Sequence, residues 1–350
     1  MQLLFTTLMI SSSWTLNLLD VCQSGIRDDG INYVHCARKS LTNIPKFSSH
    51  RFFNLAFDEL ILSENFITHI PAHAFNSLRI KRLIMSGNRL KSIEKDAFEE
   101  LENYLEELIL EFDPTIVDRI PQAIENNLAN IKSLTLIGLN LHVLPSNIFN
   151  QMKKLESLTL KSCNLQSIES HAFYSLDKQL RYLNLDYNKL DRTIFEQFHH
   201  FQSLERLSLS HNSIDEFDLQ SISYPLEYLD LSYNYLKKLV LKNFHHLKIL
   251  NLQNNLLTSD SLHGTIPYQL KEFNLDFNSM QMINSRFFIE NNSLEMLSLQ
   301  SNEFHLINAN IFQHFSHLKK LNLARNNIQI IPQGKSSPSS QTRTRSSCSS

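Results

Sequence analysis

A short stretch of this 350-residue chain is repeated, with variations, along almost its whole length. In its first clear copy, Phe57 to Leu78 (FDELILSENFITHIPAHAFNSL), the apolar residues follow neither a helical period nor a simple alternation. Only the part from Leu60 to Leu62 alternates as a strand does, and Pro71 prevents a helix through the second half. A unit this short cannot bury its own apolar side, so the copies must stack, strand beside strand, into one continuous core.

The copies share the pattern LxxLxLxxN and recur every 21 to 26 residues or so, which gives about twelve units. They include LEELILEF, LESLTLKSC, LRYLNLDYN, LERLSLSHN, LEYLDLSYN, LKILNLQNN, LKEFNLDFN, LEMLSLQSN and LKKLNLARN. The residues between the leucines point away from the core, because successive side chains of a strand alternate faces. We therefore predict a single α/β solenoid, a horseshoe with a parallel β-sheet on its concave side.

An asparagine closes most copies of the repeat. Its amide can satisfy backbone N–H and C=O groups that turn inward where the chain leaves the sheet. Asp113 and Leu139 break the row, and the longer unit between them predicts a helical turn from Pro121 to Leu128. Cys163 stands in an asparagine position, which favours a buried structural thiol over a nucleophile.

The amino end is largely apolar, has no acidic residue before Asp20 and reaches small residues near Cys22 and Ser24. This pattern is typical of a secretory signal peptide, predicted over residues 1–24, and implies export. Cleavage after Ser24 would remove Cys22, whereas cleavage near Ser13 would keep it. No later segment is long and apolar enough to span a bilayer, so no direct membrane span is expected.

The rest of the chain divides into three parts. Residues 25–50 are predicted to form an N-terminal cap, 51–332 the solenoid and 333–350 a disordered Ser-rich tail. A disulfide between Cys22 and Cys36 would hold the cap over the first repeat. The pattern stops within a repeat, so the open end is expected to fray, to associate with a second copy, or to mark a truncated or alternative product of a longer protein.

Charge and motifs argue against catalysis and nucleic-acid binding. The formal net charge of -2, without blocks of one sign, gives no electrostatic basis for nucleic acid. No hydrolase, metallopeptidase or dinucleotide motif is present, so we predict no enzyme and no cofactor. Histidine pairs such as His199-His200 and His245-His246 lack cysteine or acidic partners, so no metal site is predicted. A sequon at Asn291 predicts an N-glycan on the secreted protein.

The outward columns of the sheet change character along the chain. The early units carry a mixed charged strip that we interpret as simply solvated, comprising Asp58, Glu59, Lys81, Arg82, Glu106 and Glu107. From the sixth unit aromatic residues stand beside charged ones, at Tyr182, Asp186, Tyr187, Arg206, His211, Tyr228, Asp230, Tyr233, Asp276 and Phe277.

This second strip is the predicted binding surface for a protein or glycoprotein ligand. Tyrosine and arginine anchor interfaces because they bury a large area and keep polar groups for recognition. The alternative is that tyrosine at these positions reflects strand propensity and cross-strand stacking alone.

With IP at Ile70-Pro71 and AF at Ala74-Phe75, the repeat resembles that of the extracellular leucine-rich repeat proteins of animals. The lead-in VHCARKSLTNIP is similar to their N-terminal cap, with at most two cysteines where such caps usually carry four. The sequences of the repeats most resemble those of the arthropod chaoptin and artichoke type of adhesion and matrix proteins. The resemblance implies an extracellular role in adhesion or matrix scaffolding; the alternative is an innate-immune or signalling ectodomain that recognises a microbial or secreted ligand.

Overall fold

The computed structural model of the chain describes residues 21–46, 57–218, 225–241, 244–263, 265–282, 293–307 and 315–329. Three predictions therefore fall wholly or mainly outside the described residues. They concern the signal peptide up to residue 20, the sequon at Asn291 and the tail at 333–350.

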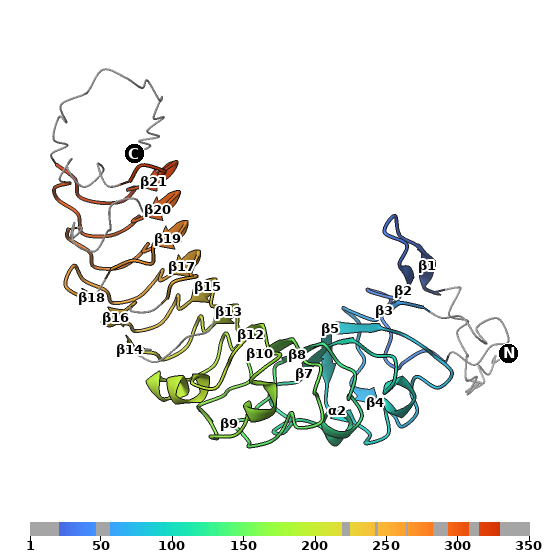
Figure 1. The fold of residues 1–350 in the computed structure, drawn as a ribbon. Coiled ribbons are helices and arrows are strands. Elements are labelled where there is room, and N and C mark those ends of the chain that lie inside the picture. The colour runs from blue at the N-terminus through green and yellow to red at the C-terminus, as the bar shows by residue number, and fades with distance from the viewer. Residues whose placement is uncertain are drawn as a thin grey trace, which may run out of the picture.

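The described repeats form a curved solenoid whose main sheet has fourteen strands. Figure 1 shows an open arc with this sheet along its inner side. The first two strands, β1 (Gln23–Ile26) and β2 (Asn32–His35), form an antiparallel hairpin, and every later pairing is parallel. The later strands are β3 (Glu59–Ile61), β5 (Arg82–Leu90), β7 (Glu107–Phe112), β8 (Ser133–Ile137), β10 (Ser157–Lys161), β12 (Tyr182–Asn184), β13 (Arg206–Ser208), β15 (Tyr228–Asp230), β17 (Ile249–Asn251), β19 (Glu272–Asn274), β20 (Met296–Ser298) and β21 (Lys320–Asn322). The predicted horseshoe with a concave parallel sheet of about twelve repeats is confirmed.

The outer side of the arc carries short strands and tight turns, with little helix (Figure 1). The outer strands are β4 (His69–Ile70) with β6 (Ser92–Ile93), β9 (Val143–Leu144) with β11 (Ser167–Ile168), and β14 (Glu216–Asp218) with β16 (Lys238–Val240) and β18 (Leu262–His263). The 3₁₀ helices are η1 (Glu99–Leu101), η2 (Tyr174–Leu176) and η3 (Arg192–Phe198). The turn predicted from Pro121 to Leu128 forms as α2 (Gln122–Asn126). Within the described ranges, no helix has both the length and the apolar composition that crossing a bilayer requires.

The core consists of columns of leucine that run through the repeats. Parallel register places Leu183, Leu207 and Leu229 side by side, and all three are fully buried. Towards the outer side, phenylalanines of successive repeats stack, as Phe75 does on Phe98 at 5.8 Å between ring centroids. The leucines of the sequence pattern therefore face inward, as the solenoid prediction requires.

The asparagines form a second column, which ties each repeat to the one before it. The amide nitrogen of Asn188 donates to the Leu160 carbonyl at 2.8 Å, and its oxygen accepts from the Cys163 N–H at 3.0 Å. Cys163 itself takes the asparagine place in its own repeat, where its thiol donates to the carbonyls of Leu136 and Lys161. Cys163 is fully buried, as predicted, and burial raises the pKa of its thiol to about 12.

A covalent bond closes the hairpin of the cap. A disulfide joins Cys22 to Cys36, and the hairpin begins at Gln23, one residue after the first of these cysteines. Cleavage after Ser24 would cut through this hairpin and remove half of the bond. A signal peptide that ends near Ser13 would leave both intact.

The interpretation of the early charged strip as simply solvated is wrong at Glu59. This side chain is only 1% exposed and pairs with Arg27, from the hairpin turn, and with Arg82, whose guanidinium lies 2.8 Å away. Arg82 also binds Glu107 at 2.6 Å. The cap hairpin adds a strand beside β3 and covers the carboxylate, an effect that no local sequence pattern reveals.

Candidate functional site on the concave face

Three of the predicted site residues are brought together by strand register. Tyr182 of β12 aligns with Arg206 of β13, which aligns with Tyr228 of β15. The Arg206 guanidinium lies over the Tyr228 ring, 4.5 Å from its centroid, and the Tyr228 hydroxyl donates to Asp230 at 3.1 Å. Burial, together with the nearby Asp230 carboxylate, raises the pKa of Tyr228 well above its usual range. This phenol therefore stays neutral and a hydrogen-bond donor.

The residue that precedes the asparagine position has a left-handed backbone in repeat after repeat, and in most repeats it lies just beyond the strand. Its occupants along the chain are Glu64, Gly87, Gly138, Ser162, Tyr187, His211, Tyr233, Asn254, Phe277, Ser301 and Arg325. Glycine adopts this conformation without strain, and a residue with a Cβ pays roughly 1–2 kcal/mol for it. At Gly138 a side chain is excluded outright, because a Cβ there would lie 2.7 Å from the Phe112 carbonyl oxygen.

Tyr187, His211 and Tyr233 occupy three consecutive positions of this left-handed row and form what we call the ring stack. The imidazole of His211 lies 4.0 Å from each tyrosine ring, centroid to centroid, and is tilted by 11° from each. The Lys161 ammonium lies 5.0 Å from the Tyr187 centroid. Tyr187 is 49% exposed and Tyr233 43%, so neighbours cover ring faces while the tyrosines remain open to solvent.

The three predicted aspartates have a different environment, because their carboxylates are used within the sheet. Asp186 accepts from the Ser208 hydroxyl at 2.7 Å and the Ser210 N–H at 2.8 Å, and Asp276 makes the same pair of bonds four repeats further on, to Ser298 and Gln300.

Asp230 is almost fully buried and accepts from the Ser232 N–H, the Tyr228 hydroxyl and the Asn251 amide. Burial is the main reason why the pKa of Asp186 is raised despite its hydrogen bonds. These carboxylates support the sheet and the left-handed turns from behind the aromatic surface.

The predicted strip thus divides into separate parts. Tyr182, Arg206 and Tyr228 lie on the strands, and the ring stack lies beside them at the strand ends. Phe277 belongs to the same left-handed row, but Asn254 stands between it and Tyr233.

Sequence reasoning missed Lys161, whose ammonium lies against the Tyr187 ring, and two exposed apolar residues of the neighbouring repeats, Tyr235 and Leu256. Tyr235 is 57% exposed and Leu256 47% exposed, and each directly follows a member of the asparagine column. Most repeats have a polar residue at the position after the asparagine. Comparing that position across the repeats would therefore have found both Tyr235 and Leu256. Lys161 stands in the same outward column as Asp186, one repeat earlier, so extending the strip by one unit would have found it.

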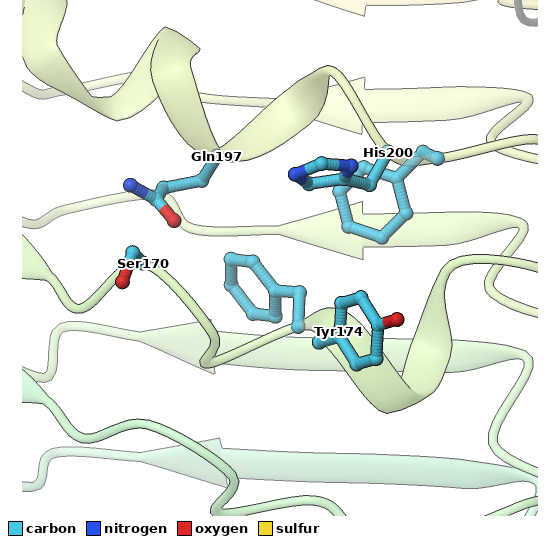
Figure 2. Close-up of a pocket in the computed structure, with 6 residues that line it drawn as sticks. Ser170, Tyr174, Gln197 and His200 are labelled. Carbon is cyan, nitrogen blue, oxygen red and sulfur yellow. The ribbon is translucent and has the colours of Figure 1, made fainter.

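A cavity lies on the outer side of the arc, away from the concave face (Figure 2). It is lined by Ser170, Phe173, Tyr174, Gln197, His200 and Phe201. In the orientation that satisfies its hydrogen bonds, the Gln197 amide donates to the carbonyls of Glu169 and Ser170, both at 3.2 Å. Among the described residues, no three His, Cys, Asp or Glu side chains are grouped so as to hold a metal ion.

The curved parallel sheet, its buried leucine columns and its asparagine column define a leucine-rich repeat solenoid. A family model described as "BspA type Leucine rich repeat region (6 copies)" matches residues 37–151 and 68–205. A second, described as "Leucine rich repeat", matches residues 178–236 and 268–334. Together these matches span more than half of the sequence, and the chain belongs to the leucine-rich repeat family.

Solved structures share this fold at low sequence identity. A chain of the Toll–Spatzle complex of Drosophila is 18% identical with a TM-score of 0.63, over 87% of this chain and 48% of that one. An internalin (inlF) from Listeria monocytogenes str. 4b F2365 is 19% identical with a TM-score of 0.53, over 78% of this chain and 82% of that one. This chain therefore spans about half the length of the chain from the Toll–Spatzle complex. Among curated proteins, none matches it.

Proposed function

We propose that this protein is an extracellular, non-enzymatic binding module that acts in cell adhesion or matrix scaffolding by holding a protein or glycoprotein on its concave face. The observation that carries the proposal is the ring stack of Tyr187, His211 and Tyr233 on the concave side. The arthropod chaoptin and artichoke type of protein, which the sequence resembles, is the adhesive class that this role matches.

The backbone gives no reason for aromatic residues in the left-handed row. Glycine or asparagine suits the conformation best, and this chain uses them at Gly87, Gly138 and Asn254. Glu64, Ser162, Ser301 and Arg325 bear the same strain, so what distinguishes the ring stack is its run of three consecutive aromatic residues. Strand propensity cannot account for the ring stack either, because its residues lie beyond the ends of the strands.

Two further observations support an extracellular role with a protein partner. Disulfides persist in oxidising compartments, and the cap of this protein carries one between Cys22 and Cys36. One protein of similar fold is described in a complex, that of Toll with Spatzle. The same likeness favours a second candidate, a receptor-like ectodomain for a microbial or secreted ligand, because that complex is described as a hub in development and innate immunity.

A binding screen with the secreted protein tests the site and separates the two candidates. Host cell-surface and matrix proteins are the expected partners of an adhesion module, and microbial or secreted ligands those of a receptor. Replacement of Tyr187, Tyr228 and Tyr233 by alanine should weaken binding of the partner found at least about tenfold, because tyrosines at interfaces carry a large share of the energy.

The matched control replaces Tyr104 and Tyr174, exposed tyrosines outside the main sheet, by alanine. Both variants should keep the circular dichroism spectrum of the unaltered protein. Equal binding by the concave-face variant and the unaltered protein would exclude this site.

A further inference from the structure

Three cations in the ring-stack repeats and the repeat before them have no acidic partner among the described residues. Lys161 lies over Tyr187, and Arg206 lies over Tyr228. Lys189 directly follows Asn188, the member of the asparagine column in the Tyr187 repeat. Within the described part of the chain, none of the three makes an ion pair. Lys189 and Arg206 are exposed and Lys161 is half-buried.

Several cations elsewhere along the sheet are neutralised by a glutamate of a neighbouring repeat. At the residues that precede the strands, Arg181 binds Glu205 at 2.8 Å, Lys248 binds Glu227 at 2.5 Å and Lys319 binds Glu295 at 2.7 Å. Ion pairs are therefore common in the column that precedes the strands, whereas no carboxylate of the described structure pairs with Lys161, Lys189 or Arg206.

The carboxylates nearest to the ring stack do not balance these cations at the surface. One carboxylate oxygen of Asp186 and both oxygens of Asp230 accept hydrogen bonds from backbone N–H groups and from serine, tyrosine and asparagine side chains. Positive groups thus reach solvent while the negative ones are bonded within the sheet. The aromatic rings also hold Lys161 and Arg206 in place, which lowers the entropy lost when they bind an anion.

We propose that this surface binds an acidic segment of a partner protein, whose Asp and Glu side chains meet Lys161, Lys189 and Arg206. The inference rests on the proposed function and specifies the chemistry of its partner. Tyr235 and Leu256 lie in the same column as Lys189, one residue past the asparagines, and offer apolar contact to such a segment. A sulfated glycan would match the cations but leave these apolar side chains uncovered, so we assign a protein segment as the occupant.

The test uses defined probes. Fluorescence anisotropy measures binding of the full secreted protein to a peptide of repeated Glu-Leu-Asp, to a peptide of repeated Lys-Leu-Lys and to heparin. We expect the acidic peptide to bind best, and to bind more weakly as salt rises, because exposed charges are screened. Lys161→Gln, Lys189→Gln and Arg206→Gln together should weaken that binding at least about tenfold.

The control removes the same charge elsewhere, through Lys132→Gln, Lys248→Gln and Lys319→Gln, and should retain binding within about twofold. The proposal is overturned by absence of binding to the acidic peptide, by equal loss in the two variants, or by a preference for heparin. A partner found in the binding screen separates this proposal from the proposed function. If the alanine variant of Tyr187, Tyr228 and Tyr233 loses binding of that partner and the glutamine variant of the three cations keeps it, the proposed function stands and only the specificity for an acidic segment is removed.

Discussion

The side-chain amide of Asn212 donates to the main-chain carbonyl of Leu185, 3.0 Å away in the preceding repeat. The same amide donates to Leu209 in its own repeat, and its oxygen accepts from the N–H of Leu190. One buried side chain thus satisfies backbone groups of two repeats at once. The asparagine column holds neighbouring repeats in register as well as supporting each turn.

Replacement of Asn212 by alanine should therefore lower the free energy of unfolding by about 3 kcal/mol, because it leaves several buried backbone groups without partners. Urea denaturation followed by circular dichroism measures the change. Asn43, an exposed asparagine in the cap, provides the control, and its replacement by alanine should cost less than about 0.5 kcal/mol. Similar costs for the two variants would contradict the bridging role.

Cys163 should be unreactive towards thiol reagents in the folded protein at pH 8. Burial raises the thiol pKa from 9.0 to about 12, so almost no thiolate forms at that pH. Since Cys348 is a second free-thiol candidate, the experiment uses a Cys348→Ser variant and counts iodoacetamide adducts by mass. We expect none before denaturation and one after it.

The same shift predicts a dependence of stability on pH. Because the folded-state pKa of Cys163 lies above the unfolded value, its contribution to stability is complete below pH 9 and is lost as the pH rises from about 9 towards 12. Cys163→Ala should remove this part of the alkaline decline in unfolding free energy. An unchanged profile between pH 8 and about 10.5 would count against the buried thiol.

Glu59→Gln should destabilise the cap strongly. The substitution removes the charge that Arg27 and Arg82 share at a nearly inaccessible position, and breaking a buried ion pair costs roughly 3–5 kcal/mol. Glu106→Gln, which breaks an exposed pair with Lys132, should cost no more than about 1 kcal/mol. Thermal unfolding of both variants provides the comparison, and equal midpoints would argue that Glu59 is solvated after all.

The mature secreted chain should begin before Cys22. The disulfide to Cys36 and the hairpin that starts at Gln23 both need this part of the sequence. Amino-terminal sequencing of secreted protein checks the start point, and a chain that begins at Gly25 would refute it.

Reduction of the disulfide should lower the free energy of unfolding by about 3 kcal/mol, the typical effect of opening a loop of this size.

The solenoid could be predicted from the sequence because its core depends on a period. Leucines at fixed spacing, closed by asparagine, determine strand, turn and stacking without reference to distant residues, and Leu183, Leu207 and Leu229 lie where the pattern placed them. The site was predicted only as a set of side chains. That Tyr187 and His211 stack depends on the left-handed backbone they share.

Other features of the concave face depended on contacts between distant segments. Glu59 is buried by a hairpin about thirty residues earlier in the chain, so its own repeat resembles an exposed one. Asp186 has a charged side chain in an outward column, yet its oxygens bond to the next repeat. The alternation of side chains along a strand shows which face of the sheet a residue points to. It does not show whether that side chain is already engaged in hydrogen bonds or ion pairs within the protein.

The left-handed row lies outside the leucine core, and its members in the ring stack lie against one another, Lys161 and Gln253. A mutation at Tyr187, His211 or Tyr233 therefore changes the chemistry shown to the surroundings while every buried leucine stays in place. Evolution can revise partner choice at these positions one residue at a time, on a frame that need not be rebuilt.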